Sequence, residues 1–313
     1  MSDVQQDLPY VDMDGAKTFF GGQCEVTVIE HSRSVISSKD IVTYQLKYPR
    51  FIHPEVMTHR VFSRNAGSSR AIPTEKLFNQ VMNEPAFFVH VGENQPGMQA
   101  NAQVSIEVRD QFYEEWKELA AINAKFAKRW ATDYNIHKQC ANRVLEPFLY
   151  ISVVLTATEF DNWNELRDHD DAQPEIHDLA ATMKRAIAES RPRLVTARHV
   201  QDPRGWHLPY VSMEERRSGA SMGDLLAMSA ARCARVSYLT HDKQNPKAED
   251  DVKLYRRLVE SRPLHASPLE HQAAVSAVNE PNRNLRGGWV QHRTLLETAG
   301  SLDKFTHVIN HKV

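Results

Sequence analysis

Alternating apolar and polar residues mark the first two strands of this 313-residue chain. From Cys24 to Ser32, and again from Asp40 to Leu46, β-branched and apolar residues alternate with polar ones, which is typical of strands with one buried face. The polar residues 37–39 separate the two segments. An unbroken apolar run from Phe148 to Thr156 predicts a third strand that is buried on both faces.

Helical periodicity is clearest between Ala102 and Tyr134. Apolar residues recur there at spacings of three, four or seven, which predicts a long helix with a core-facing stripe. The stripe consists of Val108, Phe112, Leu119, Phe126 and Trp130. Shorter helices are expected over 54–60, 137–145, 160–167, 172–189, 224–234, 250–260 and 289–296, and a turn followed by a strand over 265–278. We therefore predict an α/β fold.

The remaining stretches lack such periodicity. Residues 73–102 are predicted to be irregular, with a strand and a Pro-Gly turn in the part EPAFFVHVGENQPGMQA. Residues 190–223 are rich in Pro, Gly, Arg and Ser and are typical of a linker. We accordingly expect an arm over 1–20, a core over 21–190, a linker over 191–223 and a segment completing the fold over 224–313.

Composition narrows the class of protein. Hydrophobic residues make up 41% and charged residues 25%, as in ordinary globular proteins, and 38 basic residues nearly balance 40 acidic ones. Near-neutrality argues against a partner such as nucleic acid. No apolar run approaches the roughly 20 residues of a membrane span, and the acidic N-terminus has no signal-peptide pattern. Three distant cysteines are typical of a reducing cytoplasm, not of a disulfide frame or zinc site.

Candidate chemistry is concentrated in Thr58–Arg70, THRVFSRNAGSSR. Four basic side chains alternate there with serines, an asparagine and a glycine, a composition that favours turns over helix interiors. Guanidiniums, hydroxyls and backbone N–H groups together suit a planar, anionic ligand such as a nucleotide. A solvated basic loop is the alternative that these residues alone leave open.

This segment resembles the signature of the flavin-dependent thymidylate synthases (the ThyX family), R-H-R-x-x-S-x-N-x-x-S-x-R. Six of its seven fixed positions are occupied, by His59, Arg60, Ser63, Asn65, Ser68 and Arg70. Three further stretches are similar to family motifs: RCARVSY at 232–238, HASPLEH at 265–271 and FDNWNELRDHDDAQPEI at 160–176. The first two usually precede the signature, whereas here they follow it.

The motif order is therefore permuted, or it reflects a diverged duplication in which GGWVQHRTLLE, residues 287–297, is a second copy of the signature. The chain resembles phage-type members in this respect. The resemblance implies a ThyX-like fold with a mixed or antiparallel sheet and long helices. It also implies a homotetramer whose sites form between subunits.

The resemblance further implies an activity that converts dUMP, or another pyrimidine deoxynucleotide, with methylenetetrahydrofolate and NADPH as co-substrates and FAD as cofactor. Because the flavin carries the redox chemistry, no protein nucleophile is expected. No metal is expected either, because the sequence has no H-x-x-E-H or C-x-x-C spacing. The implied FAD contacts are His59, Arg60, Asn65, Asn162, Ser237, His265 and Ser267. The implied substrate contacts are Glu55, Ser68, Ser69, Arg70, Arg143 and Arg167, of which Ser68 and Arg167 are the implied catalytic residues.

Three positions depart from the family pattern. Thr58 replaces an Arg that helps to bind FAD, Ala66 replaces a Glu, and Glu55 stands where a Gln commonly meets dUMP. A carboxylate beside the base would accept a hydrogen bond from the amine of cytosine, which uracil lacks. The alternatives are therefore a related enzyme that methylates or hydroxymethylates another pyrimidine nucleotide for modified phage DNA, and a non-catalytic nucleotide-binding relative.

Overall fold

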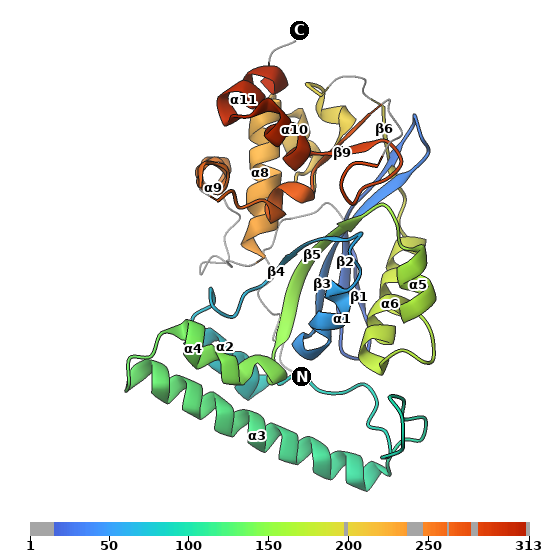
Figure 1. Ribbon diagram of the computed structural model, residues 1–313, viewed down its shortest axis with the longest axis vertical. Helices are drawn as coiled ribbons and strands as arrows, with labels where there is room; N and C mark the ends of the chain where they lie inside the picture. The colour runs from blue at the N-terminus through green and yellow to red at the C-terminus, as the bar shows by residue number, and fades with distance from the viewer. Residues whose placement is uncertain (1–15, 197–199, 237–246, 262, 277–280, 311–313) are drawn as a thin grey trace.

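A mixed six-stranded sheet forms the centre of the computed structural model, which describes residues 16–196, 200–236, 247–261, 263–276 and 281–310 (Figure 1). Its main path runs β1 (Thr18–Phe20), β2 (Glu25–Ser34), β3 (Asp40–Pro49), β5 (Tyr150–Ala157) and β4 (Ser63–Ala66), all antiparallel. The short β6 (Arg193–Val195) pairs with β2 in parallel. The α/β prediction and the first three predicted strands are confirmed.

Alternation along β3 gives the sheet two different faces. Val42, Tyr44 and Leu46 point into the larger apolar cluster, together with Ile176, Leu179 and Met183 of α6 (Pro174–Ala188). The neighbouring α5 (Asp161–Arg167) and α1 (His53–Met57) complete this face. Thr43 and Gln45 lie on the opposite face and are buried even though they are polar.

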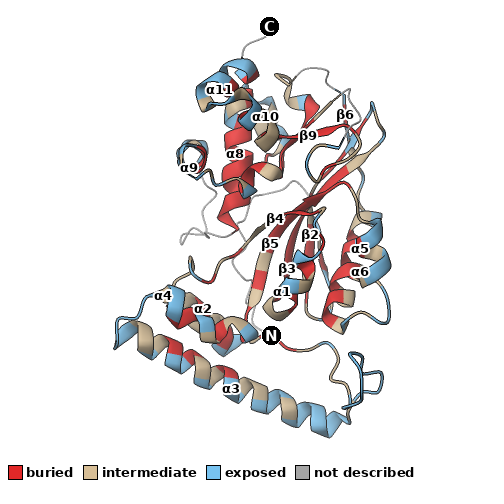
Figure 2. Cartoon of the chain, viewed as in Figure 1, coloured by how far each residue is buried: buried red, intermediate tan, exposed pale blue. Residues whose placement is uncertain are grey.

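A C-terminal lobe covers that second face. It contains a three-stranded sheet, β7 (Trp206–His207), β8 (Ala273–Val275) and β9 (Trp289–Gln291). The helices are α7 (Met213–Arg217), α8 (Met222–Arg235), α9 (Ala248–Glu260), α10 (His292–Ala299) and α11 (Leu302–Asn310). All residues of α8 except Gly223 and Asp224 are buried, so this helix is the core of the lobe (Figure 2).

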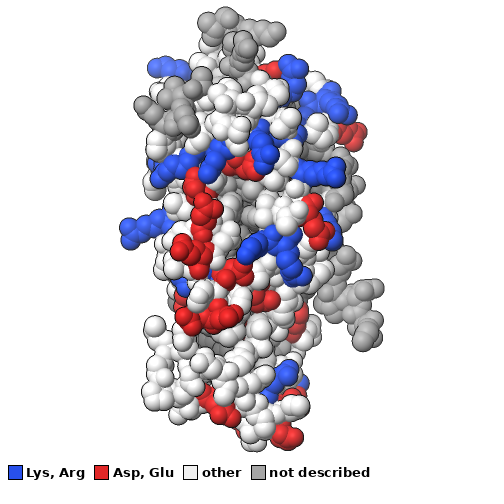
Figure 3. Space-filling view, turned by 90° about the vertical axis from the view of Figure 1, so that its right-hand side faces the viewer, with Lys and Arg blue, Asp and Glu red and all other residues white. Residues whose placement is uncertain are grey.

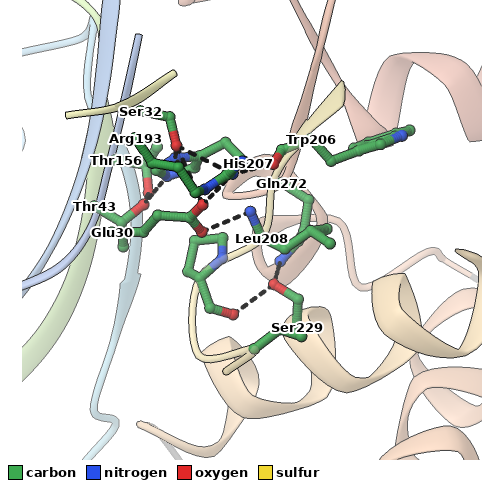
Figure 4. A network of polar contacts seen from close by, with 12 residues as sticks. Glu30, Ser32, Thr43, Thr156, Arg193, Trp206, His207, Leu208, Ser229 and Gln272 are labelled. Atoms are coloured by element: carbon green, nitrogen blue, oxygen red, sulfur yellow. Dashed lines mark hydrogen bonds and ion pairs between the residues drawn. The ribbon is translucent and has the colours of Figure 1, made fainter. Parts of the chain in front are cut away.

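Polar contacts join the lobe to the sheet (Figure 4). His207 is hydrogen-bonded through Nδ1 to Ser32 Oγ (2.9 Å) and through Nε2 to Thr43 Oγ1 (2.8 Å). Thr43 contacts Thr156 Oγ1 at 2.6 Å, and Thr156 contacts His271 Nδ1 at 2.8 Å. Burial lowers the pKa of His207 to about 4 and that of His271 to about 3, so both imidazoles are neutral at pH 7.

Glu30 lies at the edge of the same layer. Its carboxylate accepts hydrogen bonds from Arg193 (2.7 Å), Arg216 (2.9 Å) and the backbone N–H of Leu208 (2.7 Å). Burial alone would raise the pKa of Glu30, but the neighbouring cations, Arg216 foremost, lower it to about 2. The lobe is thus attached to β2 by a buried, fully paired charge.

A helical layer lies below the sheet. It consists of α2 (Thr74–Asn83), α3 (Ile106–Thr132), α4 (Lys138–Ala141) and the 3₁₀ segment η2 (Asn142–Phe148). The long helix is confirmed as α3, but its expected core-facing stripe is wrong. Ala120, Ala124 and Ala127 are buried against α2 and η2, whereas Val108, Leu119 and Phe126 are 52%, 48% and 41% exposed.

Several other expectations are corrected. Residues 74–83 form a helix instead of an irregular segment, and 84–102 contain no strand. Within the expected linker, the described residues 200–223 contain β7 and α7 and the buried side chains of Trp206, Leu208 and Tyr210. Residues 18–20 of the expected arm pair with β2 as β1, and 289–291 form a strand before α10. Among the described helices, none combines the length and the apolar character that a membrane crossing needs.

Candidate functional site

The signature begins just after α1 and places His59 against two aromatic rings. Pro54 occupies the first turn of α1, and the helix ends at Met57. His59 is 7% exposed; its ring stacks on Phe62 at 5.7 Å and meets Trp163 edge-on at 4.8 Å, centroid to centroid. Trp163 is on α5, so the signature packs directly on the helix that carries Arg167.

Arg167 fixes the protonation of His59. Its Nε donates a hydrogen bond to His59 Nε2 at 3.0 Å. Because a guanidinium only donates, Nε2 must offer a lone pair and the imidazole proton must sit on Nδ1. Burial, with the charges of Arg167 and Arg64, lowers the pKa of His59 to about 4. At neutral pH, His59 is therefore an uncharged N–H donor.

A cleft of about 730 Å³ opens beside His59, and we call it the His59 cleft. It is the size of a small-molecule site. Its walls come from the signature, from α5 and the turn before it, from the β2–β3 turn and from the C-terminal lobe. The lining residues are Thr58, His59, Arg60, Val61, Glu159, Asp161, Asn162, Trp163, Lys39, Pro281, Arg286 and Gly287.

Thr58 and Glu55 lie next to the hydrogen bond between Arg167 and His59. Thr58 Oγ1 donates to the carbonyl of Glu55 at 2.6 Å and accepts from Arg167 Nη2 at 3.4 Å. The hydroxyl that replaces the family's arginine thus helps to orient Arg167. The Oε2 atom of Glu55 is buried and has no hydrogen-bond partner among the described residues.

The second half of the signature converges on a carboxylate. Ser69 Oγ donates to Glu146 Oε1 at 2.6 Å, and Arg143 Nη1 donates to the same oxygen at 2.8 Å. Burial would raise the pKa of Glu146, but Ser69, Arg50 and Arg143 lower it overall. Arg70 is exposed and makes no ion pair with the described residues, and Ser68 is half-buried beside it.

A third group joins the signature strand β4 to the C-terminal lobe. Asn65 Nδ2 donates to the carbonyl of Cys233 at 2.7 Å, and Ser267 Oγ donates to Asn65 Oδ1 at 3.2 Å. Ser267 begins η4 (Ser267–Glu270). His265 is exposed just before it, with its backbone N–H bonded to Leu258. Ser237 lies outside the described residues.

The candidate residues therefore fall into three groups along one segment of chain. The His59 cleft contains His59, Arg60 and Asn162, with Arg167 and Glu55 adjoining. Ser69 and Arg143 contact Glu146, with Ser68 and Arg70 adjacent to Ser69 in the chain, and Asn65, Ser267 and His265 lie at the lobe. Sequence reasoning missed Glu146, Lys39, Trp163 and Arg286. Two of them carried a local signal: Glu146 lies one helical turn after Arg143, and Trp163 directly follows Asn162 in the stretch 160–176.

No cluster of three or more His, Cys, Asp or Glu side chains able to hold a metal occurs within the described ranges.

The side of the molecule that carries α5 and α6 faces the viewer in Figure 3. Basic side chains gather across the upper half of this face, with acidic side chains beside and below them. This face is thus mixed in charge.

The fold and the site together define a mixed α/β protein with a cleft formed by the signature segment, α5, the β2–β3 turn and the C-terminal lobe. Residues 27–193 match the model of the thymidylate synthase complementing protein family, and the chain belongs to that family. No curated protein sequence matches the chain.

Two solved structures of the UMP/dUMP methylase PolB from Streptomyces cacaoi are similar in part. The complex with 5-Br UMP is 18% identical with a TM-score of 0.44, and the match covers 53% of this chain and 89% of that one. For the complex with 5-Br dUMP the values are 18%, 0.43, 53% and 90%.

Proposed function

We propose that this protein is a flavin-dependent thymidylate synthase, which converts dUMP to dTMP with methylenetetrahydrofolate and NADPH through FAD. Family membership supports the proposal. The observation that carries it is the 3.0 Å hydrogen bond between Arg167 and His59, because it brings the two motifs together at one cleft.

The residues of the His59 cleft fit a flavin nucleotide. His59 offers a neutral N–H at Nδ1, Asn162 an amide and Arg60 an exposed guanidinium. The indole N–H of Trp163, in the same wall, is buried without a partner among the described residues, and such a donor is costly unless a ligand satisfies it. When bound, the flavin supplies the electron transfer that side chains cannot. Asn65, Ser237, His265 and Ser267 are proposed as further flavin contacts from the lobe.

Arg167 is the proposed catalytic group at the pyrimidine. Its Nε is committed to His59, and one Nη to Thr58, so the plane of the guanidinium is fixed. In this proposal the remaining N–H groups face the base and stabilise negative charge at N3. An oriented cation does so without reorganisation at the moment of reaction. Ser68 is the second proposed catalytic residue, beside the substrate.

Arg70, Arg143 and Ser69 are the proposed phosphate-binding residues of the substrate. Arg70 is a cation without an ion pair among the described residues. Ser69 and Arg143 are held by Glu146, so this carboxylate positions both of them. A bound phosphate would compete with Glu146 for the guanidinium of Arg143, so the Arg143 side chain could move from the carboxylate to the phosphate.

The protein is proposed to assemble as a homotetramer. The observation in favour is the apolar stripe of α3, where Val108, Leu119 and Phe126 are exposed although a solvated helix face is normally polar. Packing against another copy would bury this stripe.

The decisive experiment begins with the visible spectrum of the purified protein. We expect a flavin spectrum that NADPH bleaches anaerobically, and dTMP formation when dUMP and methylenetetrahydrofolate are added. Arg167→Ala should lower kcat/KM at least 100-fold. The control Arg217→Ala, an exposed arginine of α7, should leave it unchanged. Failure to bind FAD, or no dTMP from a flavin-loaded protein, would contradict the proposal.

Glu55 favours a second candidate, a flavin-dependent enzyme that methylates or hydroxymethylates a cytosine nucleotide. Its buried Oε2 needs a donor, and the exocyclic amine of cytosine is one that uracil lacks. Wild-type protein should then turn over dCMP in preference to dUMP, and Glu55→Gln should reverse the preference. Turnover of dUMP without any binding of dCMP would exclude this candidate.

A further inference from the structure

The C-terminal lobe supplies a cation to the His59 cleft that neither the signature nor α5 provides. Arg286 lines the cleft together with Arg60, although the two residues are 226 positions apart in sequence. Neither guanidinium forms an ion pair with any described residue. The third basic residue of the lining, Lys39, is paired with Glu159 at 2.6 Å. Asp161 is the other carboxylate of the wall.

The backbone around Arg286 is held by several different elements. Its N–H donates to Thr158 Oγ1, after β5, at 2.9 Å. The next carbonyl, of Gly287, accepts from Ser37 Oγ in the β2–β3 turn at 2.5 Å. Gly287 has a φ of +70°, and a Cβ there would lie 2.3 Å from Lys39 Cγ. The chain thus approaches closely enough to reach the cleft only because residue 287 is a glycine.

The side chain of Arg286 is also oriented. Its Nη1 donates to the carbonyls of Arg283 at 2.9 Å and Leu285 at 3.1 Å. These bonds use one nitrogen of a planar fork, so the Nε and Nη2 donors remain available within the described structure. A preorganised guanidinium with open donors binds a phosphate oxygen at a small entropic cost.

We propose that Arg286 and Arg60 form an anion site for the pyrophosphate of a dinucleotide in the His59 cleft. In FAD the pyrophosphate joins the flavin part to the adenosine part. One anion would therefore be held by Arg60 of the signature segment and by Arg286 of the C-terminal lobe. The inference rests on the proposed function in taking the dinucleotide to be FAD. The site itself needs only a phosphate-bearing ligand. Arg286 would take the place of the arginine that the family signature has where this chain has Thr58.

The test is the binding of FAD, riboflavin, ADP and inorganic pyrophosphate to the purified full chain, measured by flavin fluorescence and by calorimetry. Arg286→Ala should weaken FAD binding about tenfold or more, as expected for a lost charged hydrogen bond, and leave riboflavin binding unchanged. ADP and pyrophosphate should displace FAD from wild-type protein, and less effectively from the variant. Arg286→Gln guards against a packing defect, and Arg217→Ala is the matched charge control.

Each outcome is informative. FAD binding by Arg286→Ala and Arg286→Gln that equals that of Arg217→Ala would overturn the inference while the proposed function stands. Equal loss of FAD and riboflavin affinity would also overturn it, because a pyrophosphate contact is absent from riboflavin. If wild-type protein binds ADP through Arg286 but no FAD, the anion site stands and the proposed function fails. Absence of binding to all four probes would overturn both.

Discussion

Arg167 and His59 are in contact beside the cleft, and the hydrogen bond from Arg167 fixes the proton position of His59. His59 would be partly protonated near pH 6.5 if it were exposed, but burial and the adjacent guanidinium of Arg167 lower its pKa to about 4. A neutral N–H donor suits a carbonyl or a phosphate oxygen and leaves the only charge of the pair on Arg167. In the proposed function, His59 would thus act as a hydrogen-bond donor and Arg167 would stabilise charge on the base.

Removal of Arg167 should raise the pKa of His59. In Arg167→Ala the imidazolium no longer faces a cation, whereas burial, the larger cause, remains, so the new value should lie between about 4 and the ordinary 6.5. Histidine-selective NMR, with His59→Gln to assign the signal, measures this titration. Arg217→Ala is the control. An unchanged His59 titration would show that Arg167 does not contribute to its low pKa.

Local sequence motifs predicted the candidate residues that lie within those motifs, but not the residues that tertiary packing brings next to them. His59 and Arg167 were identifiable because each belongs to a short pattern, and the structure places them in contact. Arg286 and Glu146 escaped prediction since they become neighbours of the signature only through tertiary packing. The indole N–H of Trp163 is buried and has no hydrogen-bond partner within the described part of the chain, which no sequence pattern reveals.

At the scale of elements, α3 shows why periodicity is an incomplete guide. Its large apolar residues mark one face, but the narrow space against α2 and η2 admits alanines, so a different face is buried. The strands β2 and β3 were predictable because successive side chains of a strand point to opposite faces of the sheet, so alternating apolar and polar residues indicate one buried face. The helix α2 was missed because its buried residues, Leu77 and Val81, form only a short stripe.

The two faces of α3 should respond differently to substitution. Ala124→Leu overfills the contact with α2 and should lower the free energy of unfolding by about 1–3 kcal/mol. Leu119→Ala should change it little within one copy but weaken assembly, because Leu119 is 48% exposed. Urea unfolding and sedimentation velocity measure the two effects. A Leu119→Ala protein that assembles like wild type would remove α3 from the subunit interface.

The turn at Gly287 should tolerate no side chain. Gly287→Ala combines a left-handed backbone with a Cβ 2.3 Å from Lys39 Cγ, so it should destabilise the protein by about 1–3 kcal/mol and weaken FAD binding. Gly219 has a φ of +83° with open space around it. Gly219→Ala should therefore show only the backbone effect, about 1 kcal/mol, and normal FAD affinity. Equal behaviour of both variants in unfolding and binding assays would contradict a steric role for Gly287.

At the scale of the whole molecule, the sheet and the C-terminal lobe meet through polar groups as well as apolar ones. Ser32, Thr43 and Thr156 point from the sheet to His207 and His271 of the lobe. Such groups are stable in the interior only while every member keeps its partner. The Pro, Gly, Arg and Ser content of residues 191–223 predicts a linker. In the fold these residues carry His207, one of the central members of this interface.

The neutral histidines at this interface make stability depend on pH. His207 has a pKa of about 4 and His271 of about 3 in the folded protein, against about 6.5 in the unfolded chain. The unfolded chain therefore binds more protons below pH 6.5, so the stabilisation is complete above that pH and is lost as the pH falls toward 4. Glu30 has a pKa of about 2 in the folded protein, so its stabilisation is also lost as the pH falls, but at lower pH, between about 4.5 and about 2.

Acid should therefore weaken the attachment of the lobe well before carboxylates titrate. We expect the free energy of unfolding to fall between pH 6.5 and 5 by up to about 1.4 kcal/mol per pH unit for each buried histidine. His207→Gln should reduce this slope by one proton, whereas His169→Gln, at a side chain 58% exposed, should not. Urea titrations at several pH values measure the slope. A flat profile, or an unchanged slope in His207→Gln, would mean that His207 is not the group that couples this interface to protons.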